Sequence, residues 1–472
     1  MIAKEKIIMR AFMDEHFLLH SGTAIDLYDH IKNLPIIDYH CHLDPAAIAN
    51  NNRFRSITEL WLGGDHYKWR LMRHNGIPES HITGDAPDNE KFAVWCATIE
   101  KCIGNPGYHW AHLELRTYFG YDGVITADKA SEIYKLCNSQ IEKDDFNVHK
   151  LLKHSKVEWL GTTDDPADSL EFHKKIKEAR TDGVPMVVPS FRPSNAMDIE
   201  KPVFAEYMKK LGNISNWDDL EEALTSRINH FHQMDCRISD HALDPPVFNE
   251  KATKADAESA LKKALAGDTL TFDEITAYKT HIMLFFGAEY NKRNWVMQFH
   301  MGAQRSNNTK MIKKVGPDTG FDSMSDVNFS VPLGKMMDAM EANDALPRTT
   351  LYALNPNADD MLATMIGNFA GNGIKGRMQW GCPWWFNDNK QGMIKHLITL
   401  ANHGMISNFI GMLTDSRSFI SYPRHEYFRR IMANQLAEWV EAGEFPRNMT
   451  TLNRIAEDIA YYNVKKYFEY ST

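Results

Sequence analysis

Short apolar runs recur along the chain, and each of them ends in polar or turn-forming residues. They are rich in β-branched, aromatic and large apolar side chains, which is typical of buried strands. The eight runs occupy residues 35–42, 157–163, 186–193, 235–242, 295–302, 349–356, 377–384 and 409–416. Segments with the spacing of amphipathic helices lie between them. Strands that alternate with helices favour a parallel sheet, and eight such units are the number that closes a (β/α)8 barrel.

The spacing of the runs is uneven, which predicts where the barrel is interrupted. About 110 residues separate the first run from the second, far more than an ordinary connection between strand and helix. We interpret residues 43–156 as a helical insertion and residues 243–294 as a smaller insertion with two helices. The prediction is one α/β domain over 1–472, a TIM-type barrel with a large helical insertion after its first strand. The fourth run has the weakest strand pattern, so a doubly wound open sheet is the alternative.

Composition and charge narrow the class of protein. Hydrophobic residues make up 43% of the chain and charged residues 24%, as in a soluble globular protein. With a net charge of −9, the chain lacks the basic footprint of a nucleic-acid binder and is a poor partner for an anionic membrane surface. No stretch approaches the ~18 apolar residues of a bilayer span, and charges interrupt the N-terminal segment where a signal peptide would be apolar. The six cysteines form no C-x-x-C pair, which fits a reducing cytoplasm.

Two histidines close the first run and predict a metal site. His40 and His42 are two positions apart, so on a strand their imidazoles face the same way and can hold one divalent ion. Asp415 ends the eighth run, and the first and last strands of a closed barrel are neighbours. Its carboxylate could be a ligand, a general base or both, or it could cap the next helix. The second H-x-H pair, His230 and His232, lies in a helical segment where the two side chains do not share a face.

Other candidate residues follow further runs. His300 ends the fifth run and could bind metal, relay protons or simply be a buried histidine with one hydrogen bond. Three arginines, Arg192, Arg305 and Arg417, follow the third, fifth and eighth runs, and guanidinium groups at one rim suggest an anionic ligand. Trp384 follows the seventh run and could form the wall of a sugar-sized pocket. Residues 65–70 of the long insertion are dense in titratable groups and could supply an acid or base from above the barrel.

Several longer motifs match one known family. DYHCHL resembles the first-strand metal motif of the amidohydrolase superfamily. The more specific motifs, taken in chain order, resemble the uronate isomerase (glucuronate isomerase) family. They are GDHYKWRLMRHNG, YHWAHLELR, EWLGTTDDPADSL, CRISDHALDP, QFHMGAQRSNN, WWFND and GMLTDSRSFISYPRHEYFRRI. The family commonly has G-x-G before WWFND, whereas this chain has GCP, and Pro383 stiffens the loop that carries Trp384.

The resemblance implies a distorted (β/α)8 barrel and an aldose–ketose isomerase that works through a cis-enediol. The implied reactions interconvert D-glucuronate with D-fructuronate and D-galacturonate with D-tagaturonate. It also implies one divalent metal ion, usually zinc, on His40, His42 and Asp415. By the same resemblance Asp415 moves the C2 proton to C1, Tyr67 shuttles protons between the C1 and C2 oxygens, and His300, Arg305, Arg417, Arg192 and Trp384 complete the site. The expected partner is a small-molecule uronate, and the chain is compatible with a homo-oligomer.

Two other functions compete with this prediction. The first is a metal-dependent hydrolase on the same barrel, acting on a sugar lactone or a related acid. Such enzymes commonly place a lysine on the fourth strand and a histidine on the sixth, and neither occurs in the fourth or sixth run here. The second is a sugar-acid binding protein without catalysis, which does not require so many titratable groups at one rim.

Overall fold

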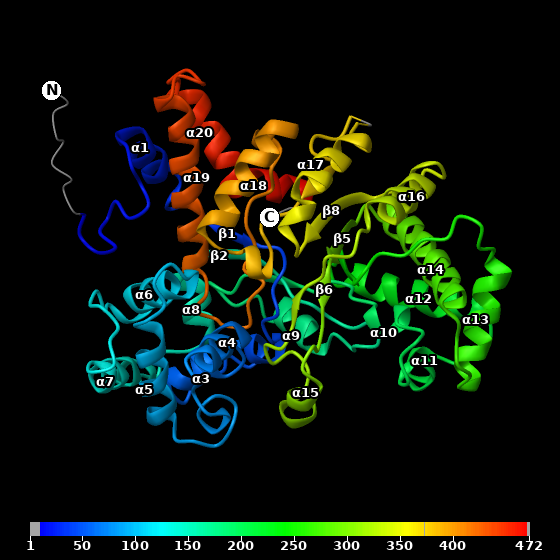
Figure 1. Ribbon diagram of the computed structural model, residues 1–472, viewed down its shortest axis with the longest axis horizontal. Helices are drawn as coiled ribbons and strands as arrows, with labels where there is room; N and C mark the ends of the chain where they lie inside the picture. Colours follow the sequence, from blue (N-terminus) through cyan, green and yellow to red (C-terminus); the bar gives the residue numbers. More distant parts are fainter. Residues whose placement is uncertain (1–9, 372, 470–472) are drawn as a thin grey trace.

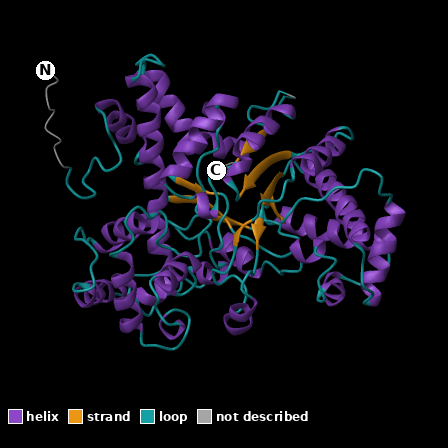
Figure 2. Ribbon diagram, in the orientation of Figure 1, coloured by secondary structure: helices purple, strands orange, loops and turns teal. Residues whose placement is uncertain are grey.

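Parallel strands form the centre of the molecule. The computed structural model describes residues 10–371 and 373–469. Its parallel strands are β1 (Ile36–Asp38), β2 (Val157–Gly161), β3 (Met186–Val188), β4 (Ile238–Leu243), β5 (Val296–Met301), β8 (Arg348–Ala353) and β9 (Met378–Trp380). A small antiparallel hairpin, β6 (Ala303–Gln304) with β7 (Ser323–Met324), follows β5. Figure 2 shows the strands enclosed by helices, as expected when both faces of a parallel sheet are covered.

The strands follow the chain order of a barrel. One sheet has the order β1-β2-β3 and another has the order β4-β5-β8-β9. Phe191 joins the two sheets, because it forms one parallel bridge to Asp164 after β2 and another to Ser239 on β4. The fourth run, which has the weakest strand pattern, forms the six-residue strand β4 and pairs along its whole length with β5. Neighbouring strands therefore follow one another in chain order, as they do in a barrel, and the open-sheet alternative is not favoured.

The eighth run closes the barrel without forming a strand. Residues 409–416 are extended but carry no strand assignment, because Gly411 and Asp415 have positive φ angles of 74° and 47° that interrupt a pleated conformation. The segment nevertheless lies against the chain that follows β1. The Asp415 amide donates to the His40 carbonyl at 3.2 Å, and the His42 amide donates to the Ser416 carbonyl at 2.9 Å. The barrel is therefore distorted at its closure, beside the candidate metal site.

Helices surround the strands and extend the molecule at both ends (Figure 1). Between β1 and β2 lie α2 (Pro45–Ala49), α3 (Ile57–Leu62), α4 (His66–His74), α5 (Asp88–Ile99), α6 (Pro106–Phe119), α7 (Ala130–Ile141) and α8 (Val148–His154). Helices α9 (Glu171–Ala179), α10 (Ser194–Met197), α11 (Phe204–Leu211), α12 (Trp217–Gln233), α13 (Lys254–Ala266) and α14 (Phe272–Lys292) come before β5. The helices α15 (Thr309–Val315), α16 (Ser330–Glu341), α17 (Asp359–Asn368) and α18 (Lys390–His403) follow β5. The chain ends with α19 (Pro423–Glu441), α20 (Met449–Glu457) and α21 (Asn463–Tyr467), and α1 (Gly22–Ile31) packs on α19.

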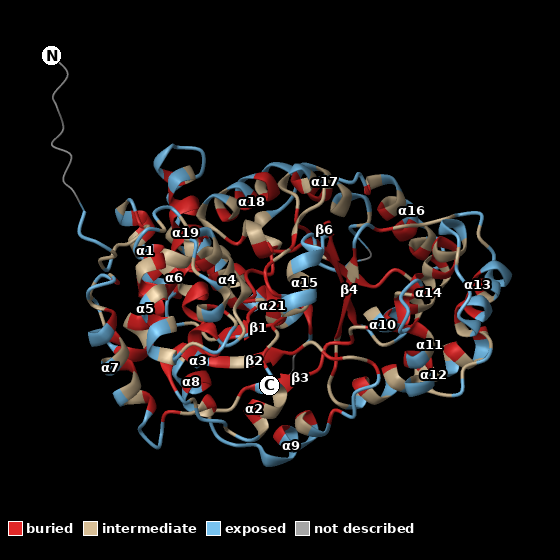
Figure 3. Ribbon diagram, turned by 60° about the horizontal axis from the view of Figure 1, so that its bottom comes forward, coloured by how far each residue is buried: buried red, intermediate tan, exposed pale blue. Residues whose placement is uncertain are grey.

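Two apolar cores hold these elements in place. The larger one joins the barrel strands to the helices around them, including α12, α14, α16 and α19. The second lies under helices α3 to α8 and reaches the strands through residues such as Cys41, Leu160 and Val187. Figure 3 shows buried residues along the strands and exposed residues on the outer helix faces. Among the described helices, none combines the length and apolar character that a bilayer crossing requires.

Candidate active site

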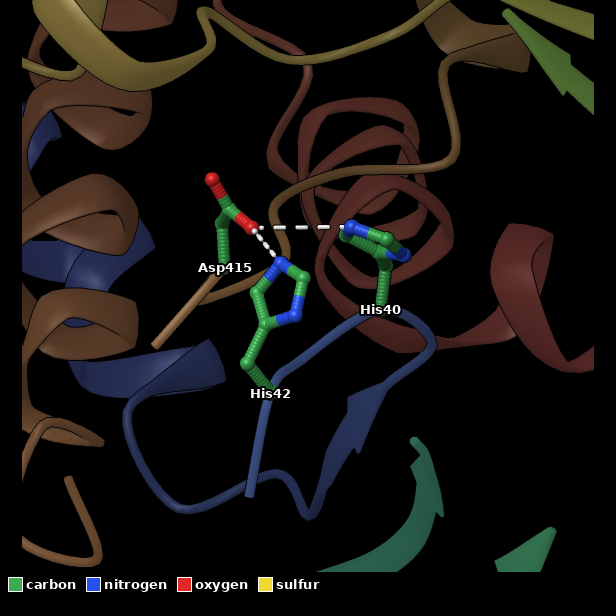
Figure 4. A group of neighbouring side chains, drawn as sticks. All are labelled: His40, His42 and Asp415. Atoms are coloured by element: carbon green, nitrogen blue, oxygen red, sulfur yellow. Dashed lines mark ion pairs between the residues drawn. The ribbon is translucent and has the colours of Figure 1, made fainter. Parts of the chain in front are cut away.

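Three predicted ligand residues converge at the closure of the barrel. His40 and His42 lie just after β1, and Asp415 lies near the end of the extended segment 409–416. The Nε2 atoms of His40 and His42 both face Oδ1 of Asp415, at 3.5 and 3.0 Å (Figure 4). The other carboxylate oxygen, Oδ2, accepts a hydrogen bond of 3.0 Å from the indole of Trp384. Asp415 is thus held from both sides and does not cap a helix, since α19 begins only at Pro423.

The backbone at Asp415 is fixed by buried hydrogen bonds. Its φ of 47° is uncommon for a residue with a side chain, and such conformations persist only where the surroundings enforce them. The preceding Thr414 donates to both carboxylate oxygens of Asp38, from its amide at 2.8 Å and from its hydroxyl at 2.6 Å. Asp38 is fully buried at the end of β1. The end of the first strand therefore determines where the Asp415 carboxylate points.

The electrostatic environment keeps Asp415 ionised and His42 neutral. Burial opposes the charged carboxylate, but His40 and His42 together hold the pKa of Asp415 well below its usual range. Burial lowers the pKa of His42 to about 4, despite the neighbouring carboxylate. For His40 burial acts in the same direction, yet Asp415 and Asp240 outweigh it and raise the pKa. A carboxylate and a neutral imidazole are the protonation states that ligate a metal ion.

The residues present fit a divalent ion. The ligand atoms of His40, His42 and Asp415 all lie within 4.8 Å of one another. Two metal–ligand bonds of ~2.0–2.2 Å at a tetrahedral angle separate their ligand atoms by roughly 3.3–3.6 Å, close to the observed separations. Two histidines and one carboxylate leave room for further ligands, as in catalytic rather than structural zinc sites.

A second polar group lies behind the first and contains a residue that the sequence did not reveal. His300, on β5, donates its Nδ1–H to Oδ1 of the Asp240 carboxylate at 2.7 Å, and its ring lies 4.8 Å from that of His40. Asp240, on β4, also pairs with Arg192 at 3.2 Å. Burial opposes its charge, but Arg192 and His300 hold the pKa of Asp240 well below its usual range. His40, Asp240 and His300 thus form a second set of closely spaced ligand atoms.

Most of the predicted site residues line one cavity, here called the rim cavity. It has a volume of about 350 Å³. Its walls include His40, His42, His66, Asp164, Arg192, His300, Arg305, Asp318, Trp384, Trp385, Asp415 and Arg417. Arg305 pairs with Asp244 at 2.9 Å, and its guanidinium lies 5.7 Å from the Trp385 ring. Three guanidiniums therefore face the same space as Asp415, which suits an anionic ligand.

Tyr67 lies in a neighbouring cavity rather than in the rim cavity. This side cavity, also about 350 Å³, is lined by residues that include Tyr67, Trp110, Asp388 and Arg424. His66 and Trp385 line both cavities and separate them, with ring centroids 5.4 Å apart. Burial raises the pKa of Tyr67 well above its usual value, and the charge of Asp415 acts in the same direction. The dense run 65–70 therefore reaches the rim cavity through His66, at the start of α4, and Tyr67 follows it in the side cavity.

The second H-x-H pair, His230 and His232, has structural partners. His230 and His232 lie on α12, where His230 contacts the Ser169 carbonyl and His232 accepts a hydrogen bond from the Trp295 indole. Neither residue lines the rim cavity. The second H-x-H pair is therefore no part of this site.

The fold and the site together define a distorted α/β barrel protein with an H-x-H pair after the first strand and an aspartate at the closing segment. The sequence model of the glucuronate isomerase family matches residues 9–468. The chain belongs to this family.

Named relatives and solved structures agree with the family assignment. The uronate isomerase of Caldanaerobacter subterraneus subsp. tengcongensis is 50% identical over 465 residues, which cover 97% of this chain and 99% of that protein. The uronate isomerase of Caldicellulosiruptor bescii is 49% identical and covers 98% of this chain and 100% of its own length. The crystal structure of uronate isomerase from Thermotoga maritima superposes with a TM-score of 0.92 at 34% identity, covering 97% of this chain and 100% of that one. The predictions of the family and of the barrel are confirmed.

Proposed function

We propose that the protein is an aldose–ketose isomerase that interconverts D-glucuronate with D-fructuronate, and D-galacturonate with D-tagaturonate. The observation that carries this proposal is the position of Asp415. An ionised carboxylate faces a cavity that three arginines also line, in a chain that belongs to the glucuronate isomerase family. A hexuronate brings a carboxylate for the arginines and a C2 proton for the aspartate. We place the reaction in hexuronate catabolism.

The residues of the site have separate roles in substrate binding and in proton transfer. Asp415 accepts the C2 proton of the open-chain sugar and returns it at C1, passing through a cis-enediol. Trp384 orients this carboxylate by donating to Oδ2, which leaves Oδ1 toward the histidines. Tyr67 and His300 are the candidates for moving protons between the C1 and C2 oxygens. Arg417 lines the same cavity as Asp415 and can offset developing negative charge.

A divalent ion, with zinc as the first candidate, would be held by His40, His42 and Asp415. When bound, such an ion stabilises negative charge that develops on sugar oxygens. The protein's own contribution is to keep Asp415 ionised, to orient its two oxygens and to line the cavity with guanidiniums.

A hydrolase reaction is not favoured by the strands themselves. The fourth barrel strand, β4, reads ISDHAL and contains no lysine, and the sixth, β8, reads RTTLYA and contains no histidine. A second metal ion of the hydrolase kind would therefore lack these ligands. A binding protein without catalysis does not explain an ionised carboxylate held between two imidazoles and an indole.

The proposal is tested by direct assay of the purified protein. Incubation with D-glucuronate or D-galacturonate should yield the matching ketose, D-fructuronate or D-tagaturonate, measured by chromatography or by coupled reduction of the ketone. Sugar lactones serve as the comparison substrates. Hydrolysis of a lactone with no ketose formed from any hexuronate would replace this proposal with the hydrolase.

We predict one divalent ion per chain, bound by His40, His42 and Asp415. Anomalous scattering should place it with ligand bonds of ~2.0–2.2 Å. Removal of the ion by a chelator should abolish isomerisation, and stoichiometric zinc should restore it, because the ligand group is complete without rearrangement. Elemental analysis after His42→Ala should show a loss of metal that His230→Ala does not cause. An ion found at His230 and His232 instead would refute the assignment.

We predict that one of Arg192, Arg305 and Arg417 binds the substrate carboxylate. Replacing that arginine with Met should raise KM for D-glucuronate by about 10- to 100-fold, because a charge-assisted hydrogen bond contributes ~1.5–3 kcal/mol. Arg447→Met is the matched control, since Arg447 is exposed and pairs with Asp26 away from the rim. Unchanged KM values in all three rim variants would place the carboxylate elsewhere.

We further propose that the enzyme acts in the cytoplasm. Its cysteines in the described residues are all free, which suits a reducing compartment. The partner is the small-molecule uronate, and a homo-oligomer remains a prediction for solution measurements.

A further inference from the structure

A buried arginine outside the predicted site contacts elements on which the reaction depends. Arg424 is the second residue of α19 and is only 2% exposed. Its Nη1 donates to the carbonyl of Thr414 at 3.1 Å. Its guanidinium also lies 4.1 Å from the ring of Trp110 and 5.6 Å from the ring of Tyr67. One side chain from the last part of the barrel thus touches both the chain before Asp415 and the phenol of the insertion.

The position of this arginine is costly for folding. Removing a guanidinium from water requires compensating partners, and a cation in the first turn of a helix opposes the helix dipole. The compensation is incomplete, because the Arg424 Nε has no hydrogen-bond partner among the described residues and the ion pair of its Nη1 with Asp388 is long, at 3.7 Å. Further negative charge comes from Asp65 and Glu114, which act through space. If this position served packing alone, an apolar side chain would fill it without leaving a buried polar atom unpaired.

The contact to Thr414 bears on the direction of the Asp415 carboxylate. Asp38 holds the amide and hydroxyl of Thr414, and Arg424 holds its carbonyl. Thr414 is therefore fixed on both sides, immediately before a residue whose φ of 47° must be enforced by its surroundings. Loss of the arginine releases one of the two constraints.

The contact to Tyr67 bears on the second proton-handling group. The hydroxyl of Tyr67 has no hydrogen-bond partner among the described residues, so the ring is positioned by packing. His66 stacks on one side of it with ring centroids 4.7 Å apart, and Arg424 approaches it from within the side cavity. The arginine thus connects α4 of the insertion to segment 409–416 of the barrel.

We propose that Arg424 is a positioning residue that sets the geometry of Asp415 relative to Tyr67. This inference rests on the proposed isomerase function. A guanidinium is suited to the role, because its planar group bonds a carbonyl at its edge while its face lies on aromatic rings. A lysine offers the charge without this combination.

The test compares Arg424→Ala and Arg424→Lys with Arg429→Ala. Arg429 is the matched control, because it lies on the same helix, is 4% exposed and donates to the carbonyls of Leu34 and Pro35, away from both cavities. We expect Arg424→Ala to lower kcat by ~10²-fold with KM and metal content little changed, since a misplacement of about 1 Å costs that much. Arg424→Lys should fall between this variant and the wild type. Arg429→Ala should lower Tm but keep kcat per folded molecule.

Chemical rescue separates positioning from general stability. Arg424 lines the side cavity, so free guanidinium at millimolar concentration can reach the space left in Arg424→Ala. It should restore part of kcat in that variant and none in Arg429→Ala, whereas methylammonium should not substitute. The inference is overturned if Arg424→Lys keeps the wild-type kcat. It is also overturned if the activity of Arg424→Ala falls only in proportion to the loss of folded protein and guanidinium does not restore it. An inactive wild type on every hexuronate would instead overturn the proposed function.

Discussion

Asp415→Asn is expected to lower kcat on D-glucuronate by ~10²- to 10⁴-fold, the range that loss of a general base costs. The amide keeps the size of the side chain and still offers an oxygen toward His40 and His42. It cannot take up the C2 proton. The Trp384 indole, which donates to Oδ2 in the native protein, can still donate to the amide oxygen only if that oxygen turns away from the histidines.

Metal content must be measured in the same samples, because Asp415 also belongs to the ligand group. Asp26→Asn is a matched control, since Asp26 is exposed, pairs with Arg447 and lines neither cavity. Running the wild-type reaction in heavy water shows whether the C2 proton is carried to C1 or exchanged with solvent. Near-normal turnover by Asp415→Asn with its metal bound would remove Asp415 from the role of base.

Tyr67→Phe is expected to lower kcat by about 10²-fold without changing metal content. The substitution removes only the hydroxyl, which bonds to no described protein group, so the stacking on His66 and the contact with Arg424 are retained. Stability should therefore stay close to that of the wild type, and the loss should be confined to proton transfer. The measurement is kcat for both hexuronates, with Tm recorded alongside.

A second phenol in the same insertion provides the control for Tyr67. Tyr118 on α6 is buried and hydrogen bonds to Ser155 at 2.6 Å. Tyr118→Phe should cost ~0.5–1.5 kcal/mol of stability and leave kcat unchanged. If Tyr67→Phe behaves in the same way, the proton carriers are His66 and His300, both of which line the rim cavity.

The barrel could be predicted from the sequence because most of its strands are continuous apolar runs. β5 is buried at every position, so its pattern is strong without any knowledge of its neighbours. The strand pattern of β4 is weak in the sequence because three of its residues, Ser239, Asp240 and His241, are polar. They are buried by partners that lie far away in the chain. The closing segment 409–416 has the apolar pattern of a strand but does not form one, because its apolar residues do not reveal the two positive φ angles.

The residues of the candidate site were likewise predictable only where the pattern along the chain, and not a distant contact, determines their position. His40, His42 and Asp415 were found because strand alternation and barrel closure bring positions to one rim, and the structure places them within hydrogen-bonding range. Asp240 was missed, although it lies in the polar part of the fourth run, because its importance depends on contacts with His300 and Arg192. Arg424 gave no signal at all, since an arginine at the start of a helix usually lies on the surface.

The side cavity shows how the protein's chemistry is distributed over its architecture. The candidate ligands His40, His42 and Asp415 come from the barrel. His66 and Tyr67 come from α4 and Trp110 from α6, both in the segment between β1 and β2. Barrel enzymes commonly diversify by changing the loops at one end and keeping the strands. The proposed base, Asp415, comes from the barrel, and the proposed proton carrier, Tyr67, comes from α4. A change that displaces α4 should therefore impair isomerisation while it leaves the three candidate ligands in place.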